Sequence, residues 1–302
     1  MNLLRRALRR AKRIMDGNAA HWRGDMPGTQ PRSQRAVQAL DTLTSASVLV
    51  VMAHPDDEAI AAGALMQRVP RLGVICVTDG APRTGDFARD AGFDNWMDYA
   101  GARRREAEAA LALLQREIAP FRNLGIADQE AAFHLVPAAR FLARAMRAGF
   151  SHVITHAYEG GHPDHDSTAF CVHAAAALIA RDGGTPPVIV EAPLYNAPGG
   201  RFQSSKFLPH ADGGPETVFD LSATQQTLKR RMFDCHATQS KVFAPFDVTR
   251  EQFRTAPRYH FLAPPHYGDV GYNAYMGRFT GMIWRRHAGQ ALRELGLMEE
   301  LA

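Results

Sequence analysis

The sequence predicts an α/β fold, in which a Rossmann-like, mostly parallel sheet has helices on both faces and a smaller α+β region follows at the C-terminus. Strand-like and helix-like segments alternate from Ser45 to about residue 200, which is typical of such sheets. The chain has 302 residues, 46% of them hydrophobic, enough for one large core or one core with a smaller C-terminal lobe. Two Gly- and Asp-rich loops, at 78–95 and 156–166, follow predicted strands, and ligands of such sheets bind beyond the strand ends.

The individual elements are predicted from short β-rich runs and from the longer helical stretches between them. Strands are expected at 47–54, 72–78, 121–126, 152–156 and 187–193. Helices are expected at 57–68, about 97–118, 134–148 and 166–182, and a last one near 222–236 precedes an aromatic-rich tail. We expect a basic helix and linker at 1–40 and one domain at 41–302, with its core at about 46–200 and a substrate-side lobe at about 200–302.

The positive charge of the chain is concentrated at its N-terminus. Residues 1–16 hold six of the 35 Lys and Arg residues and one of the 31 acids, so the rest is close to neutral despite the net charge of +4. This distribution argues against binding of nucleic acid by the body of the protein. Residues 1–16 are predicted to form an amphipathic helix, which either packs on the protein's own surface or docks on an anionic membrane. They lack the apolar core and cleavage site of a signal peptide.

Composition also limits the class of protein and its location. Cys76, Cys171 and Cys235 are far apart and form neither a disulfide framework nor a CxxC zinc motif, which favours a cytoplasmic setting. No stretch reaches the 18 apolar residues needed to span a bilayer. The sequence has no P-loop, no GxGxxG after a strand and no GxSxG motif, which argues against nucleotide binding and serine hydrolysis.

A histidine and three acids follow the first predicted strand, in VVMAHPDDEAIAAG at 50–63. With Pro55 in the first turn of a helix, the i, i+3 spacing places His54 and Asp57 on one side, close enough to share an ion. Asp56 then points elsewhere, toward whatever the ion holds. Acids in a first helical turn are also stabilised by the helix dipole, so this motif alone does not require a metal.

A second His-Pro-Asp motif follows the fourth predicted strand, in GGHPDH at 160–165. Its histidines, His162 and His165, again have i, i+3 spacing. Both motifs come at the ends of parallel strands, so we expect them to meet at one edge of the sheet. Two histidines and one carboxylate with an open position for water are typical of catalytic zinc, and the same set suits non-haem Fe²⁺. The sequence therefore predicts one divalent ion per chain.

The pair AHPDDE (53–58) and HPDH (162–165) resembles the motifs of the zinc-dependent PIG-L/LmbE-like deacetylases, and the resemblance runs from about residue 46 to 245. Three further segments are similar to parts of that family: VTDG at 77–80, RRREAEAALALL at 103–114 and CHATQ at 235–239. The resemblance implies three zinc ligands, which are His54, Asp57 and His165. It implies three catalytic residues, which are the general base Asp56, the oxyanion-stabilising His162, and Asp164 as the partner that orients His162.

The resemblance also implies properties outside the ligand set. A histidine paired with a carboxylate favours its charged form, so we expect the pKa of His162 to lie above the ordinary value of about 6.5. Asp79 and Arg103 are candidate substrate contacts, the alternatives being a turn at Asp79 and a solvated charge at Arg103. Some family members carry a tyrosine two residues before the HPDH histidine, where this sequence has Gly160, and Tyr158 is out of register.

Together these features predict a metal-dependent hydrolase that removes an N-acetyl or other N-acyl group from an amino-sugar-containing substrate through metal-activated water. One alternative is an amidase that acts on larger, thiol- or antibiotic-type conjugates. Another is a non-catalytic membrane-surface binding protein on the same fold, against which the acid–base set of Asp56, His162 and Asp164 argues. The tail tyrosines are expected in the core of the C-terminal lobe rather than as a sugar platform; they are Tyr259, Tyr267, Tyr272 and Tyr275.

Overall fold

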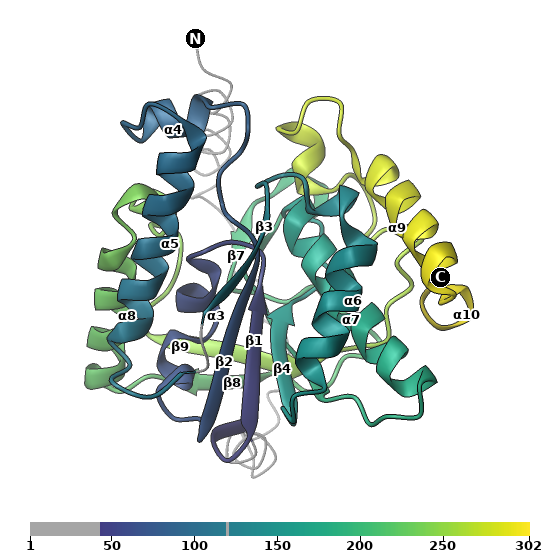
Figure 1. Cartoon of the computed structure of the whole chain (residues 1–302), viewed down its shortest axis with the longest axis horizontal. Coiled ribbons are helices and arrows are strands. Elements are labelled where there is room, and N and C mark those ends of the chain that lie inside the picture. The colour runs from purple at the N-terminus through teal and green to yellow at the C-terminus, as the bar shows by residue number, and fades with distance from the viewer. Residues whose placement is uncertain (1–42, 119–120) are drawn as a thin grey trace, which may run out of the picture.

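A seven-stranded sheet runs through the centre of the protein (Figure 1). The computed structural model describes residues 43–118 and 121–302, so the helix predicted at 1–16 lies outside the described residues. The strand order is β3-β2-β1-β4-β5-β9-β8, and the first five strands pair in parallel. The predicted α/β class with a mostly parallel sheet is confirmed.

The parallel part of the sheet consists of the five strands that the alternating pattern predicts. Their bounds are β1 Ser47–Met52, β2 Arg71–Thr78, β3 Arg122–Ile126, β4 His152–His156 and β5 Val188–Ala192. Two antiparallel strands complete the edge beside β5, namely β9 Arg250–Thr255 and β8 Thr217–Asp220. A separate hairpin pairs β6 Tyr195–Asn196 with β7 Gln203–Ser204. Chain beyond residue 200 thus extends the central sheet, and the lobe boundary expected near that residue stays a prediction.

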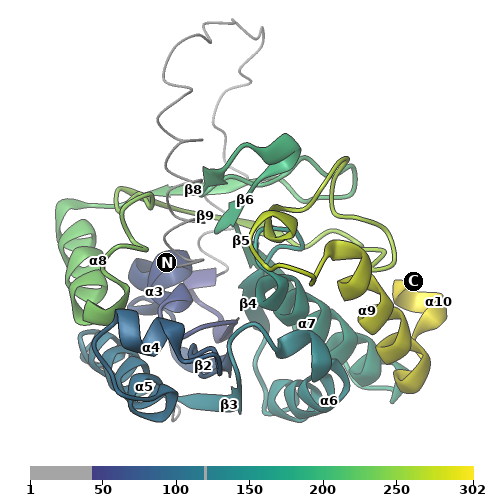
Figure 2. The ribbon, with the colours of Figure 1, turned by 90° about the horizontal axis from the view of Figure 1, so that it is seen from above.

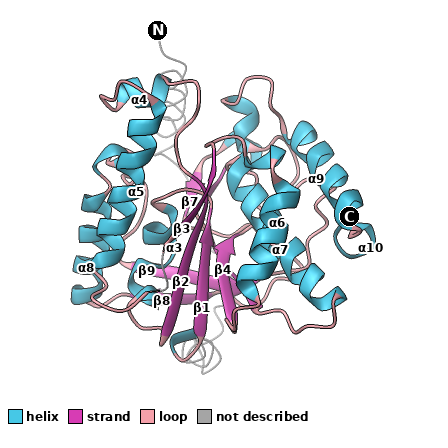
Figure 3. Cartoon of the chain, viewed as in Figure 1, coloured by secondary structure: helices cyan, strands magenta, loops and turns pink. Residues whose placement is uncertain are grey.

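The helices lie in two layers, one on each face of the sheet (Figures 2 and 3). One layer contains α3 Asp57–Met66, α5 Trp96–Ala112 and α8 Ala223–Cys235. The other contains α6 Leu135–Met146, α7 Pro163–Arg181 and α9 Gly281–Leu295. Two short helices are α4 Asp86–Asp90 and α10 Met298–Leu301. No helix in the described ranges is long and apolar enough to cross a membrane.

The sequence of β1 explains why it occupies the middle of the sheet. Val48, Val50 and Met52 pack in the cluster beneath α3 and α8, whereas Leu49 and Val51 pack in the cluster beneath α6 and α7. Side chains alternate between the two faces of a strand, so an unbroken apolar run buries both faces at once. The strand ends at Met52, two residues before His54.

The aromatic tail packs over the N-terminal half of α7. Trp284 is fully buried and its Nε1 donates to Ser167 Oγ at 2.9 Å. Tyr272 donates its hydroxyl to Asp166 Oδ2 at 3.2 Å. Tyr259 and Tyr272 lie in the core as expected, but Tyr267 is fully exposed and Tyr275 is 37% exposed. For those last two tyrosines the expectation of core positions was wrong, because they lie in the irregular chain that precedes α9.

A buried ion pair between Lys229 and Glu251 binds the backbone groups left unpaired at a break inside α3. Ala62 has non-helical dihedrals, and beyond it the N–H groups of Ala64 and Leu65 donate to the Glu251 carboxylate at 2.8 and 2.9 Å. On the other side of the break, Lys229 Nζ donates to the Ile60 carbonyl at 2.8 Å and to Glu251 Oε1 at 3.0 Å. The two side chains thus satisfy backbone groups that an unbroken helix would have paired with each other.

We expect Glu251→Ala to lower the free energy of unfolding by about 3–5 kcal/mol, because it leaves Lys229 as an unpaired buried charge and orphans two N–H groups. The double variant Lys229→Met/Glu251→Gln should recover part of this loss, since it removes the charge and keeps an oxygen acceptor for the N–H groups. Urea unfolding of the two variants and the wild type measures both effects. Equal stability of Glu251→Ala and the wild type would contradict this account of the break.

Candidate metal and catalytic site

The two His-Pro-Asp motifs meet at the centre of the sheet, beyond the carboxyl ends of β1 and β4. These strands are neighbours, yet α3 follows β1 onto one face and α7 follows β4 onto the other. The two helices diverge above these strand ends, which is the usual ligand position in such sheets. The expectation that parallel strands bring both motifs to one edge is confirmed.

One carboxylate oxygen, Oδ2 of Asp57, is the centre of the cluster. It lies 3.2 Å from Nδ1 of His54 and 3.5 Å from Nε2 of His165. It also accepts the backbone N–H of His54 at 2.8 Å, which fixes the turn between β1 and α3. All three side chains are more than nine-tenths buried. The structure therefore brings the three predicted metal ligands together around a single atom.

A further histidine that sequence reasoning missed belongs to this cluster. His156 is the last residue of β4; its Nε2 lies 3.4 Å from Asp57 Oδ2 and accepts the N–H of Ala53 at 2.9 Å. Its ring stacks on that of His165, with centroids 4.1 Å apart. The signal was present in the sequence, because His156 ends the strand that leads to the second motif.

The carboxylate of Asp164 does not bond to His162, the residue that it was expected to orient. That carboxylate is 3.2 Å from Nε2 of His54 and accepts the N–H groups of Gln129 and Ala131, whereas the Asp164 backbone N–H donates to Nδ1 of His162. The carboxylate thus orients His54 and the chain after β3, while the backbone fixes the ring of His162. A carboxylate on the far nitrogen of a histidine is a frequent support for metal ligation through the near nitrogen.

Asp128, at the end of β3, is the second residue that sequence reasoning missed. Its Oδ1 lies 3.2 Å from Nε2 of His54 and 4.0 Å from Nε2 of His162. The pKa of Asp128 falls well below its usual range, because the charge of His54 outweighs the burial that would raise it. No motif marked this residue, but β3 is the third strand whose carboxyl end reaches the same edge.

The surroundings of His54 and His162 shift the pKa values of these two histidines in opposite directions. Burial opposes the charge on His54, yet Asp128, Asp164 and Asp57 raise its pKa well above the usual value. Burial lowers the pKa of His162, and the neighbouring charge of His54 lowers it further. The expected upward shift for His162 was wrong, because burial and the neighbouring charge of His54 outweigh the effect of the carboxylates around it.

Asp56 has an unusual backbone conformation and forms an ion pair with Arg103. Its φ of 148° is rare for a residue with a side chain, and its Oδ2 lies 2.9 Å from Nη2 of Arg103. Burial raises the pKa of Asp56 to about 7, against the effect of Arg103 and with that of Asp57. A carboxyl group with its pKa near neutrality is suited to accept and return a proton.

The two candidate substrate contacts each bond to other parts of the protein. Arg103 is 4% exposed and faces Asp56 rather than solvent. Asp79 makes a salt bridge with Arg83 at 2.7 Å, and Arg83 in turn lies over the ring of Trp96 at 3.8 Å. Asp79 also accepts the N–H of Ala81, the turn contact named as its alternative role. Substrate contacts at these two positions remain predictions.

The missing tyrosine before the HPDH motif has a steric explanation. Gly160 has a φ of +71°, and a Cβ there would come within 2.8 Å of Val270 Cγ1 in the tail. Tyr158 is buried and donates its hydroxyl to the Ala263 carbonyl at 2.9 Å. Instead, the tail places Tyr275 beside the motif, with its ring centroid 6.2 Å from that of His162 and its hydroxyl on the Gly161 carbonyl.

The donor set fits a divalent transition metal. Imidazole nitrogen and carboxylate oxygen are the atoms that zinc takes as ligands, and the groups Asp57–His156–His165 and His54–His162–His165 each hold such atoms within 4.8 Å of one another. Two buried ring nitrogens of the cluster lack a hydrogen-bond partner in the described part of the chain; they are Nδ1 of His156 and Nδ1 of His165. Buried polar atoms normally have a partner, so these call for a water or an ion.

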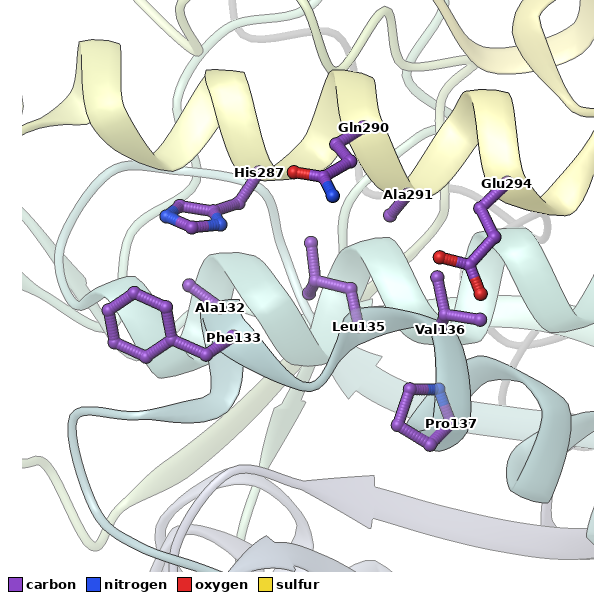
Figure 4. Close-up of a pocket in the computed structure, with 9 residues that line it drawn as sticks. All are labelled: Ala132, Phe133, Leu135, Val136, Pro137, His287, Gln290, Ala291 and Glu294. Atoms are coloured by element: carbon purple, nitrogen blue, oxygen red, sulfur yellow. The ribbon is translucent and has the colours of Figure 1, made fainter.

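A surface groove between α6 and α9 contains none of the predicted site residues (Figure 4). Phe133 and His287 face each other at one end of it, and Pro137 and Glu294 lie at the other. Its remaining lining residues are Ala132, Leu135, Val136, Gln290 and Ala291. With one exposed carboxylate and one imidazole at opposite ends, the groove has no cluster of metal-ligating groups.

A buried carboxyl beside the second motif makes stability depend on pH. Glu159 accepts the N–H of Leu194 and the amide of Asn196, and burial raises its pKa from 4.5 to about 8. The folded state therefore keeps a proton that the unfolded chain releases, so this contribution to stability is complete below about pH 4.5 and is lost as the pH rises through about 8.

We expect Glu159→Gln, which keeps an oxygen acceptor but does not titrate, to flatten this dependence. Relative to the variant, the wild type should lose on the order of 3 kcal/mol of unfolding free energy between pH 5 and pH 8. Urea unfolding at intervals across this range measures the difference. Glu294→Gln, at an exposed site, serves as the control, and parallel pH profiles for Glu159→Gln and the wild type would refute the assignment.

Comparison with known proteins identifies a family that the chain resembles. Residues 49–176 match the family model described as PIG-L, GlcNAc-PI de-N-acetylase, which confirms the resemblance inferred from the two motifs. No curated protein matches the chain.

Solved structures share the fold. An A40926 pseudoaglycone deacetylase has a TM-score of 0.52 at 20% identity, over 70% of this chain and 96% of that one. The zinc-inhibited form of a teicoplanin deacetylase has a TM-score of 0.53 at 17% identity, over 69% and 97%. A deacetylase–teicoplanin complex has a TM-score of 0.54 at 16% identity, again over 69% and 97%.

Proposed function

From the premise that residues 49–176 form a domain of the PIG-L family of de-N-acetylases, we propose that this chain is a metal-dependent hydrolase. It removes an N-acetyl, or other N-acyl, group from a substrate that contains an amino sugar. The observation that carries the proposal is the buried Asp56 carboxyl, with a pKa near 7, next to the ligand cluster centred on Asp57.

His54, Asp57 and His165 would hold the ion, with the far nitrogen of His54 held by Asp164 and Asp128. A bound divalent ion such as Zn²⁺ acts as a Lewis acid, which polarises an acyl carbonyl and lowers the pKa of water toward neutrality. His156 packs against His165 and limits the directions in which that ring can turn.

Asp56 supplies the acid–base chemistry. In its ionised form the carboxylate accepts a proton from the attacking water, and it then gives that proton to the nitrogen of the departing amino sugar. Leaving as a neutral amine lowers the barrier to breaking the C–N bond. Arg103 at 2.9 Å keeps the ionised form of Asp56 accessible despite its burial.

His162 stabilises the tetrahedral oxyanion as a hydrogen-bond donor. Its Nδ1 accepts the N–H of Asp164, so in the neutral ring the proton lies on Nε2. A neutral imidazole therefore still presents an N–H to the substrate, and the role does not require the raised pKa expected from the sequence. One such donor contributes about 10²–10³-fold to kcat.

Several attributes of the substrate and the setting are part of the proposal. Structural neighbours include deacetylases named for A40926 pseudoaglycone and teicoplanin, which keeps an amidase for larger conjugates as the second candidate. The three scattered cysteines favour a cytoplasmic location, and the positive charge of residues 1–16 supports contact with anionic membranes.

The test is a screen of N-acetylated sugars and glycoconjugates of increasing size for released acetate. Release from amino sugars supports the proposal, and cleavage restricted to larger acyl conjugates favours the amidase. No release from any substrate, together with vesicle binding that is lost on deletion of residues 1–16, would replace the enzyme with a membrane-surface binding protein. The matched control is the same screen with Asp56→Asn.

A further inference from the structure

The backbone of Asp56 is strained at the position of the proposed base. Its φ of 148° and ψ of −28° lie in a region that residues with side chains rarely adopt. Four described non-glycine residues have positive φ, and of these only Asp56 is buried. Such a conformation persists only when neighbouring groups hold it, so the question is which groups do so.

Glu58 holds the backbone of Asp56. Its Oε2 accepts the Asp56 N–H at 3.0 Å from a side chain that has no solvent exposure. The other oxygen, Oε1, faces Nε2 of His236 at 3.8 Å, and His236 is itself fully buried at the end of α8. The Glu58 carboxyl is therefore confined between the turn that it supports and the end of the neighbouring helix α8.

Arg103 holds the same residue from the other side. Its Nη2 lies 2.9 Å from Asp56 Oδ2 and donates to the Pro55 carbonyl at 3.1 Å. One nitrogen therefore contacts both the side chain of Asp56 and the peptide group that precedes it. Its Nη1 donates to the Gly80 carbonyl at 2.6 Å. A Cβ on Gly80 would lie 2.5 Å from this nitrogen, so the loop after β2 admits the guanidinium only with glycine there.

Resting on the proposed function, we propose that Glu58 and Arg103 are positioning residues, which together fix Asp56 in the orientation needed for proton transfer. Glu58 sets the peptide and Arg103 sets the carboxylate. Glu58 is inaccessible to a substrate, and both terminal nitrogens of Arg103 are already bonded within the protein. The segment RRREAEAALALL therefore contributes a support for the base through its first arginine.

The test is a pair of double-mutant cycles with Asp56→Asn. Arg103→Met and Glu58→Met should each lower kcat by about 10–10²-fold, as expected for a misplaced catalytic group, with KM and metal content within about twofold of the wild type. In the Asp56→Asn background, the same changes should cost less than about threefold more, because their effect acts through Asp56. Arg104→Met, on the exposed face of the same helix, is the matched control and should match the wild type.

Conservative variants keep the test informative if the methionine variants do not fold. Glu58→Gln retains an oxygen for the Asp56 N–H and should recover most of the kcat lost in Glu58→Met. Arg103→Lys keeps a charge but cannot reach both carbonyls, so its kcat should lie between those of the wild type and Arg103→Met. A rise in KM of about tenfold or more in both backgrounds would overturn the proposal in favour of substrate binding, and so would equal kcat losses with and without Asp56.

Amide hydrogen exchange provides a measurement that needs no substrate. The Asp56 amide should exchange at least about tenfold faster in Glu58→Met and Arg103→Met than in the wild type and Arg104→Met, because the hydrogen-bonded turn opens more often. Unchanged exchange would overturn the positioning role. An inactive wild type with this exchange pattern intact would instead count against the proposed function alone.

Discussion

Chelation of the divalent ion should abolish hydrolysis of N-acetylated amino sugars, and His165→Ala should yield protein that purifies with little metal. His165 Nε2 is 3.5 Å from Asp57 Oδ2, so its loss removes one of three ligands and leaves the ion with water in its place. Even outer-shell changes at metal sites weaken binding by about 10–100-fold, so loss of a ligand should cost at least ~10²-fold in affinity. Elemental analysis and acetate release measure the two effects.

The control for this prediction is His134→Ala, which removes an exposed histidine at the start of α6 and should retain metal and activity. Zinc, iron and other divalent ions added back after chelation should restore activity to different extents, which identifies the preferred ion. Full activity after exhaustive chelation would contradict the metal-dependent mechanism. Normal metal content in His165→Ala would instead show that His156 and Asp57 hold the ion with another partner.

Most of the fold could be predicted because the relevant signals are local. Each parallel strand is a short apolar run, and each crossover helix between two such runs is long enough to identify by length and composition. The proximity of the two motifs could be predicted as well, since both follow parallel strands of one sheet. Strands β8 and β9 and helix α9 were missed, because their short or mixed sequences become ordered only by packing on the edge strand and on α7.

The site residues that were not predicted were missed for a different reason. Asp128 and His156 carry no motif of their own, and each enters the site because the carboxyl ends of β3 and β4 reach the same edge of the sheet as the end of β1. The burial of Arg103 depends on the loop at Gly80, some 23 positions away in sequence. The wrong expectation for the pKa of His162 has the same origin, since the burial of its ring and the position of His54 beside it are set only by the folded arrangement.

The two adjacent carboxylates of the first motif should have separable roles. Asp56→Asn should retain the ion but lower kcat by about 10²–10⁴-fold, because the amide cannot accept a proton. Asp57→Asn should instead lose the ion, since Oδ2 of Asp57 is the atom that His54 and His165 both approach. Acetate release at saturating substrate and elemental analysis of the same preparations distinguish the two outcomes.

The pH profile gives a second, independent measure of Asp56. Burial raises its pKa to about 7, and a bound cation would lower this value, so the base is ionised above its pKa and protonated below it. The activity of the wild type should therefore fall as the pH drops through a value at or below about 7, and the residual activity of Asp56→Asn should lack this acidic limb. If Asp56→Asn and Asp57→Asn lose metal alike, or if the acidic limb persists in Asp56→Asn, the proton passes through another group, and Asp56 serves to hold the ion.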